Sequence, residues 1–259
     1  MWTVCGSKAA YRQPNTVPNR GRGERMAQPE ERPITVEFFH DALSAWAFPF
    51  SRRLRQFVEH HSSITVIHRV YPMADSPDFF SRLFPDPVAA KREVVMEHWL
   101  EAKELEEDER INCALMMERD FPYPYSIPNA LGAKAAELLG GQVAHWEFFD
   151  RVQTAHLTEC RNIADYQVLA DCAEQSGLNR EQWLEAVKTE QVKAMVEEDM
   201  QVAERYGILR NPALVADGRF QLPGDCRSIL GFRITTEALE RWYADVQRRL
   251  NMGYQVFES

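Results

Sequence analysis

The 259-residue sequence lacks features that define several classes of protein. Its five cysteines form no C-x-x-C pair and show no metal-ligand spacing, which excludes dithiol exchange within one such motif. We expect them to be reduced cytosolic thiols. No apolar run approaches the roughly 18 residues of a transmembrane helix, and the N-terminal region is polar and basic, without the apolar core of a signal peptide. These absences predict a cytoplasmic protein that does not enter a membrane.

Excess basic charge is also missing. The sequence holds 30 Lys and Arg against 39 Asp and Glu, a formal charge of -9. It therefore lacks the basic excess that would neutralise nucleic-acid phosphates, so no nucleic-acid partner is expected. The expected partner is a small molecule or a peptide, and a homodimer stays open. The seven histidines show neither H-x-x-x-H nor H-E-x-x-H spacing, so no metal site is expected.

The two ends of the chain carry little structural signal. Residues 1–32 combine Pro, Asn, Arg and Gly without hydrophobic periodicity, which predicts a disordered N-terminal extension, with Met26 as an alternative start. A transit peptide is the competing interpretation because the segment contains several arginines. A short C-terminal tail is expected over residues 251–259.

Regular structure begins after Pro33. Residues 34–39 form a short β-rich run, and the helix that follows, over residues 46–60, has a 3.6-residue apolar period. Residues 64–71 give a second strand, which Pro72 ends. One helix between the two strands predicts a parallel βαβ unit. The apolar positions of the helix are Phe50, Leu54, Phe57 and Val58.

Residues 75–205 are expected to be nearly all helical and to form an inserted domain. Asn179 and Gln182 have the form of a capping box, and Gly177 is expected to end a helix over residues 166–175. The charged run 101–110 predicts a solvated helical face, with an acidic interaction surface as the alternative.

An aromatic segment interrupts the helical block. Residues 121–128, with sequence FPYPYSIP, predict a loop. Its aromatic side chains could line a pocket, although ordinary loop packing is the simpler interpretation.

Strands return near the C-terminus. Residues 213–216 and 219–222 flank Asp217-Gly218, a pair that predicts a two-residue hairpin because both central positions need positive φ. A final amphipathic helix over residues 236–250 would pack on the sheet. Residues 33–74 and 206–250 therefore make one mixed α/β domain, with the helices of 75–205 inserted after the second strand.

This order and several local motifs resemble the DsbA family of thioredoxin-fold proteins, over roughly residues 34–250. The FrnE-like branch is the nearest in likeness, through AHLTECRNIAD at residues 155–165, Gly177-Leu178 and AERYGILRNP at residues 203–212. The resemblance implies a thioredoxin-like fold in which Ser44 and Ala47 occupy the positions of the redox cysteines.

The resemblance also places Pro212 at the position of a cis-proline opposite the active-site helix. The neighbouring backbone groups of Asn211 would then hold an extended peptide or glutathione. An ordinary turn proline is the alternative.

The segment Asp41-Ala42-Leu43-Ser44 is similar to the entry of kappa-class glutathione transferases and 2-hydroxychromene-2-carboxylate isomerases. In those enzymes a serine faces the glutathione sulfur. The resemblance implies that Ser44, at a helix N-terminus, would stabilise a glutathione thiolate. Ser44 is followed by Ala45-Trp46-Ala47, which departs from the usual Ser-Pro-Tyr-Ser. A plain N-cap for the helix is the competing role.

The same resemblance suggests further site residues. Gly224, Asp225 and Arg227 would hold the glutamyl end of glutathione, although Asp225 is one residue out of register, and Trp46 would contact the substrate. His40 is expected close to Ser44, where it would tune a thiol or act as a general base, with simple hydrogen bonding as the alternative.

Two functions follow as hypotheses. The first is a glutathione-dependent transferase or isomerase whose helical insertion forms an apolar pocket for the second substrate. The second is a non-catalytic module that binds a peptide or protein. A closed pocket beside Ser44 would favour the enzyme, and an open groove would favour the binding module.

Overall fold

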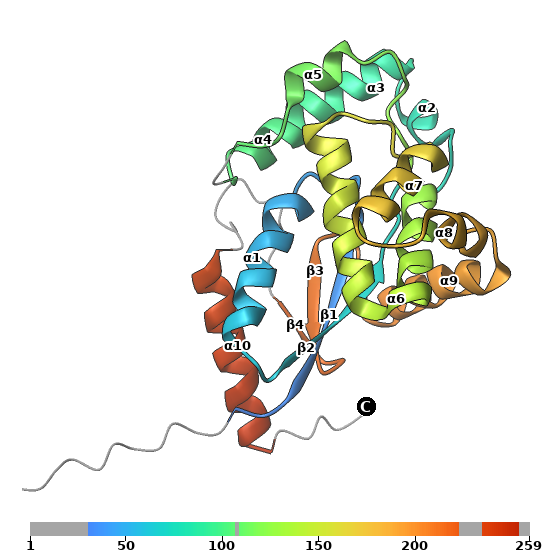
Figure 1. Ribbon diagram of the computed structural model, residues 1–259. Coiled ribbons are helices and arrows are strands. Elements are labelled where there is room, and N and C mark those ends of the chain that lie inside the picture. The colour runs from blue at the N-terminus through green and yellow to red at the C-terminus, as the bar shows by residue number, and fades with distance from the viewer. Residues whose placement is uncertain (1–30, 107–108, 223–234, 254–259) are drawn as a thin grey trace, which may run out of the picture. The chain divides into compact units, whose positions relative to one another are not determined.

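The computed structural model describes residues 31–106, 109–222 and 235–253, which contain one sheet with the strand order β2-β1-β3-β4 (Figure 1). β1 pairs parallel with β2 and antiparallel with β3, and β3 pairs antiparallel with β4. The strands are β1 (Ile34–His40), β2 (Ile64–Val70), β3 (Ala213–Ala216) and β4 (Phe220–Gln221).

The helices fall into two groups along the chain. α1 (Ala47–His60) joins β1 to β2, and α10 (Thr236–Asn251) follows β4 in the sequence. The segment between β2 and β3 is helical, which confirms the predicted thioredoxin-like α/β fold with a large helical insertion after the second strand. The inserted elements are α2 (Phe79–Leu83), α3 (Pro87–Glu93), η1 (Val94–Trp99), α4 (Leu100–Lys103), α5 (Cys113–Glu118), α6 (Ile127–Gln153), η2 (Thr154–Thr158), α7 (Tyr166–Gln175), α8 (Arg180–Ala186) and α9 (Glu190–Arg205), with η1 and η2 in π-helical conformation.

The hairpin prediction is confirmed. β3 and β4 pair across Asp217 and Gly218, whose φ angles are 48° and 65°. Asp tolerates the left-handed region better than most residues and Gly adopts it without a steric cost, so this dipeptide fits the tight turn.

The predicted helix ends at Asn179 and Gly177 are confirmed as well. Asn179 is the N-cap of α8, and its side-chain oxygen accepts a hydrogen bond from the Gln182 amide at 2.9 Å. Gly177 has φ of 88° and follows α7, and the Leu178 amide donates to the Ala173 carbonyl at 3.0 Å. This is the Schellman arrangement that a glycine after a helix favours.

The helix predicted over residues 101–110 is wrong beyond its first turn. α4 ends at Lys103, with Glu104 as its C-cap. The Glu106 side chain accepts a hydrogen bond from the Ile111 amide at 2.8 Å, and the Arg53 guanidinium donates to the Leu105 carbonyl. These contacts, with a backbone amide just beyond the charged run and with an arginine side chain of α1, take the place of the continued helix that the charge pattern suggested.

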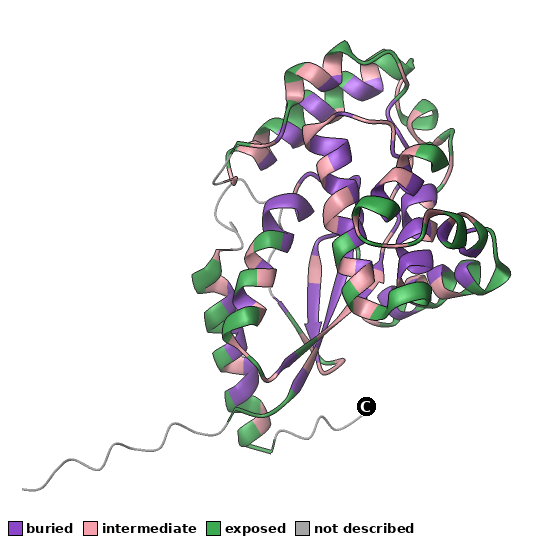
Figure 2. Cartoon of the chain, viewed as in Figure 1, coloured by how far each residue is buried: buried purple, intermediate pink, exposed green. Residues whose placement is uncertain are grey.

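The two faces of the sheet are buried by different helices (Figure 2). Phe38 belongs to the main core, which includes side chains of α1, α6 and α10. Phe39 points to the opposite face and packs with Val202 and Ala203 of α9. The alternation follows from the two-residue period of a strand. α10 also contacts α1, where the Phe57 and Tyr243 rings lie 5.8 Å apart.

α6 contains a kink that matters for the interior. Gly141 has φ of 71° and ψ of -164°, a backbone conformation that is essentially restricted to glycine. After this residue the helix continues in a new direction and carries Gln142 and His145 toward β2. Gln142 Oε1 accepts a hydrogen bond from the His68 amide at 2.6 Å.

The outer boundaries are only partly visible. Residues 1–30 and 254–259, which hold most of the predicted extension and tail, lie outside the described residues. Arg32, predicted as part of the extension, makes backbone hydrogen bonds with the Gln247 side chain at 2.9 and 2.8 Å. Among the residues that the structure describes, no helix combines the length and apolarity that a membrane span requires.

Candidate functional site

The loop after β1 is organised by a buried carboxylate. Asp41 Oδ1 accepts a hydrogen bond from the Leu43 amide at 3.0 Å, while Oδ2 accepts from the Met73 amide at 3.0 Å and from Ser126 Oγ at 2.6 Å. Burial raises the pKa of Asp41, and the hydrogen bonds that it accepts act in the opposite direction. Asp41 thus connects the loop to the segment after β2 and to the start of α6, a role that the sequence analysis missed.

Ser44 lies in this loop, but it does not cap α1. The N-cap is Trp46, and no side chain forms a capping hydrogen bond there. The Ser44 carbonyl accepts from the Ala47 amide at 3.1 Å and from Gln153 Nε2 at 3.0 Å. The chain enters α1 through a turn, so the serine sits too early to reach the first helical amides with its hydroxyl. The predicted N-cap role is therefore wrong.

The Ser44 hydroxyl is buried in this loop without a hydrogen-bond partner among the described residues. The residue is 3% exposed. A buried hydroxyl without a partner costs about 1–3 kcal/mol. Such a group is suited to bind a polar atom of a ligand.

A cavity of about 260 Å³ lies beside Ser44. Its volume is close to the lower end of the ~300–1,000 Å³ that small-molecule sites occupy. The insertion supplies most of its wall, which is largely apolar and aromatic. Among the lining residues are Ser44, Trp46, Phe80, Trp99, Tyr123 and Asn211.

Two aromatic residues of this wall are fixed by hydrogen bonds. Trp99 Nε1 donates to the Tyr123 hydroxyl at 2.9 Å, and this hydroxyl lies 3.2 Å from His156 Nε2. Burial lowers the pKa of His156 to about 3, so the ring is neutral and its Nε2 can accept a hydrogen bond from the Tyr123 hydroxyl. Tyr123 belongs to the loop that the sequence analysis considered for a pocket, and the structure confirms that it lines one.

The Asn211–Pro212 peptide bond is cis, as the resemblance implied. Asn211 lines the same cavity as Ser44 and Trp46, and its side-chain amide donates to the Tyr71 carbonyl at 3.3 Å. The structure therefore brings together Ser44, Trp46 and Asn211 from the predicted site, with Pro212 adjacent. Gly224, Asp225 and Arg227 lie outside the described residues, and so does Cys226.

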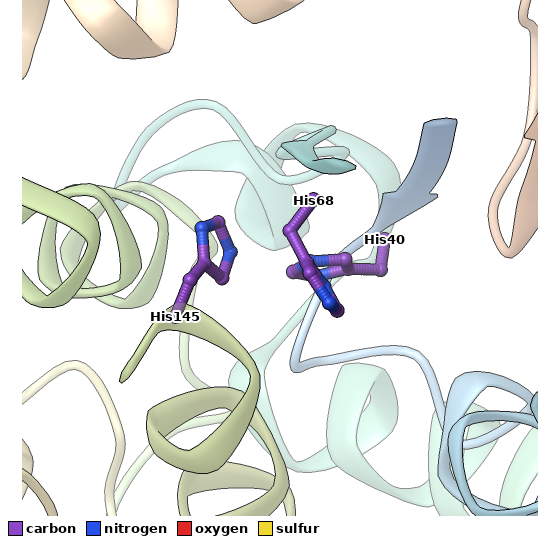
Figure 3. Close-up of side chains that lie close together, drawn as sticks. All are labelled: His40, His68 and His145. Atoms are coloured by element: carbon purple, nitrogen blue, oxygen red, sulfur yellow. The ribbon is translucent and has the colours of Figure 1, made fainter. Parts of the chain in front are cut away.

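His40 is not among the residues that line this cavity. It lies in a cluster with His68 and His145, shown in Figure 3, where the first two rings lie close together and the third faces them. His40 Nε2 is 3.2 Å from His68 Nδ1. The His40 side chain lies in the core against Phe38 and Phe149. Its role as a general base stays a prediction.

The cluster is buried and uncharged. Burial lowers the pKa of all three imidazoles well below the usual value for histidine, and electrostatic repulsion from Lys134 acts in the same direction. His145 Nδ1 lies 2.7 Å from Glu137 Oε2. Sequence reasoning found no metal-type histidine pair because the three residues come from β1, β2 and α6.

The described cysteines are not activated thiols. Burial raises the pKa of Cys160 and of Cys172 to about 11 each, and it also raises the pKa of Cys113. All three are free. A thiol with such a pKa carries almost no thiolate at neutral pH, which does not fit a redox-active cysteine.

The four-stranded sheet with helices inserted between β2 and β3 defines a thioredoxin-fold protein. Residues 35–228 match the DSBA-like thioredoxin domain, and the chain belongs to this family. No curated protein matches the sequence.

Solved structures agree with this fold. The cytosolic disulfide reductase DsbM from Pseudomonas aeruginosa is 22% identical with a TM-score of 0.61, covering 84% of this chain and 99% of its own. A 2-hydroxychromene-2-carboxylate isomerase is 13% identical with a TM-score of 0.56, covering 86% and 100%. A DsbA variant from Pseudomonas aeruginosa is 12% identical with a TM-score of 0.52, covering 88% and 91%. At these identities the similarity shows the fold.

Proposed function

We propose that this protein is a glutathione-dependent transferase or isomerase in which Ser44 stabilises the glutathione thiolate. The observation that carries the proposal is the buried Ser44 hydroxyl, which has no partner among the described residues, on the wall of the cavity. A hydroxyl that donates to a thiolate favours the charged form over the thiol. The reactive sulfur would then belong to the co-substrate and not to the chain.

The start of α1 contributes less than the sequence argument assumed. The amides of Ala47 and Phe48 already donate to the Ser44 and Ala45 carbonyls, at 3.1 and 3.3 Å, and Pro49 has no amide proton. The hydroxyl of Ser44 is consequently the main donor in the proposal, with the helix dipole as a secondary effect.

The rest of the cavity is consistent with a second, apolar substrate. Aromatic side chains of the insertion, including Phe80 and Trp99, form part of the cavity wall. Asn211 would position the peptide backbone of glutathione, and Trp46 would contact the ligand. Gly224, Asp225 and Arg227 would hold its glutamyl end, an assignment that rests on the sequence alone.

One structural neighbour supports the choice of glutathione, and a second supports an isomerase as the reaction class. DsbM has been solved with GSH, and the isomerase is a relative in fold. The non-catalytic alternative, a module that binds a peptide or protein, requires an open groove. The cavity at Ser44, about 260 Å³, is close in volume to the smallest small-molecule sites, which supports the enzyme. We retain a cytoplasmic location and a small-molecule partner as predictions, and a homodimer stays open.

Calorimetric titration of the full chain with glutathione tests the proposal. We expect the parent to bind, and Ser44→Ala to weaken binding by roughly 10-fold or more, since a hydrogen bond to a charged group contributes about 1.5–3 kcal/mol. The ultraviolet absorbance of bound thiolate should also report a higher thiol pKa in this variant.

Ser51→Ala is the matched control. Ser51 is a buried serine of α1 whose hydroxyl is bonded to Asp150 at 2.6 Å, and it does not line the cavity. It should bind glutathione like the parent. Absence of binding by the parent would reject the glutathione hypothesis, and equal binding by Ser44→Ala would reject the role of Ser44.

A further inference from the structure

The three histidines at the end of β1 have an arrangement that ordinary core packing does not require. His40 and His68 come from neighbouring parallel strands, and His145 comes from α6 after its kink at Gly141. One nitrogen from each ring lies within 4.8 Å of the others. We propose that His40, His68 and His145 bind a transition-metal ion that prefers imidazole ligands, with Zn²⁺ as the ion to test.

The distances are near those that such an ion needs. Two imidazole nitrogens on a tetrahedral zinc ion, each about 2.0–2.1 Å from the metal, lie roughly 3.3 Å apart. His40 Nε2 and His68 Nδ1 are already 3.2 Å apart. Binding therefore needs only a modest approach of the His145 ring, which faces this pair in Figure 3.

Two ring nitrogens in the cluster lack a partner. His68 Nε2 and His145 Nε2 are buried and make no hydrogen bond within the part of the chain that the structure describes. Both residues are 0% exposed. Buried polar atoms in proteins nearly always have a partner, so the bare His145 Nε2 is suited to bind a ligand, while His68 would bind the ion through Nδ1, the nitrogen next to His40 Nε2.

The surroundings of His145 match a metal ligand. Its Nδ1 donates to Glu137 Oε2 at 2.7 Å, which leaves the lone pair on Nε2. Metal-bound histidines commonly donate their second N–H to a carboxylate in this way, and the contact orients the ring and raises its basicity.

The charges near the cluster also permit a cation. Lys134 lies 2.6 Å from Glu137 and 2.7 Å from Asp199, and Arg69 pairs with Asp199 and Glu37 at 2.9 and 2.8 Å. This network has two cations and three carboxylates, so its net charge is negative. Arg55, a further cation nearby, is paired with Glu147 at 2.8 Å and with Asp150 at 2.7 Å.

The position indicates a structural ion. Aromatic rings enclose the cluster, with the centroid of Phe149 3.9 Å from that of His40 and the centroid of Trp146 4.7 Å from that of His68. The ion would join β1, β2 and α6 directly behind the loop that carries Ser44. This inference does not depend on the proposed glutathione function.

The test measures zinc in the untagged full chain, expressed with added zinc and passed through gel filtration. We expect about one ion per chain in the parent by mass spectrometry. His145→Asn keeps an amide near the Nδ1 position but removes Nε2, and it should lower zinc affinity at least 10-fold in competition with a chromophoric chelator. His156→Asn, which replaces an equally buried histidine outside the cluster, should bind like the parent.

A parent without zinc, or equal affinity in both variants, would overturn the proposal. X-ray absorption at the zinc edge of the parent provides a second readout, because His145→Asn could fail to fold. Nitrogen ligands with imidazole scattering are expected. Sulfur ligands would place the ion on cysteines and would also overturn the assignment.

Discussion

The cavity beside Ser44 and the cluster around His40 begin at neighbouring positions at the end of β1, yet they are built in opposite ways. The cavity has an apolar, aromatic wall with a single buried hydroxyl that lacks a partner among the described residues. The cluster consists of polar rings in the core and is backed by a charged network. One strand end thus leads into two differently built regions, a largely apolar cavity and a polar cluster in the core.

The largest expected effect is on the cavity wall. Trp99 is 0% exposed and donates to Tyr123, so Trp99→Ala should lower the free energy of unfolding by about 3–5 kcal/mol, chiefly through lost packing and the cavity that remains, with the loss of one hydrogen bond to Tyr123 as a smaller part. Denaturant unfolding measures the change. Met96→Ala, on an exposed position of the same helix, should cost under about 0.5 kcal/mol. A similar cost for both would show that the wall does not stabilise the insertion.

The junction between the two regions should be nearly as sensitive. Asp41→Asn replaces one acceptor oxygen by an NH₂ group, which would face amide or hydroxyl donors now bonded to the carboxylate. We expect a loss of about 3 kcal/mol in the free energy of unfolding. Asp75→Asn, at a site where the side chain is 65% exposed, should change stability little. If Asp41→Asn is equally mild, Asp41 does not hold the loop.

The cluster side is tested at the kink. An added Cβ at Gly141 would meet nothing within 4 Å, so Gly141→Ala acts through backbone conformation alone. Its φ and ψ should make the substitution cost about 1–3 kcal/mol by chemical unfolding, and displace His145. Val143→Ala, on an exposed neighbour, is the control. Unchanged NMR signals of the cluster histidines in Gly141→Ala would show that the kink does not position His145.

The smallest effect depends on pH. His156 is neutral in the fold with a pKa of about 3, whereas the unfolded chain protonates it below about pH 6.5. The stability that neutral His156 contributes to the fold is fully present above pH 6.5 and is lost as pH falls toward 3. At pH 5.5 the free energy of unfolding should be lower by about 1.4 kcal/mol. His156→Gln keeps an acceptor for Tyr123. It should lower the number of protons taken up on unfolding by up to one, and so flatten the dependence of the free energy of unfolding on pH. Unfolding curves between pH 5 and 7 measure it, with exposed His60→Gln as the unchanged control; an identical slope in His156→Gln would contradict the assignment.

Much of the fold could be predicted because its signals are local. The Asp217-Gly218 turn, the Asn179 cap and the Gly177 helix end each depend on residues within one turn of the chain, and the structure confirms all three. The helix expected after Lys103 failed because Glu106 and Leu105 bond to groups that the local pattern does not include.

In the candidate site, too, the features carried by local motifs were predicted, and those that depend on distant segments were not. The cis bond before Pro212 and the presence of Ser44, Trp46 and Asn211 in one cavity followed from the resemblance. The capping role of Ser44 was wrong, because two turn residues, Ala45 and Trp46, separate it from the helix start at Ala47. Asp41 escaped notice because its partners, Met73 and Ser126, come from distant segments.

Composition and periodicity along the chain were enough to give the absence of a C-x-x-C pair and the order of strands and helices. The family followed from the resemblance of local motifs. The packing of segments far apart in the chain places Ser44 beside a cavity, with a hydroxyl that has no partner among the described residues, and turns His40 inward to His68 and His145. The physical reason is that burial and hydrogen-bond satisfaction depend on which distant segments pack together. The spacing of residues along the chain does not show which side chains of β1, β2 and α6 will meet.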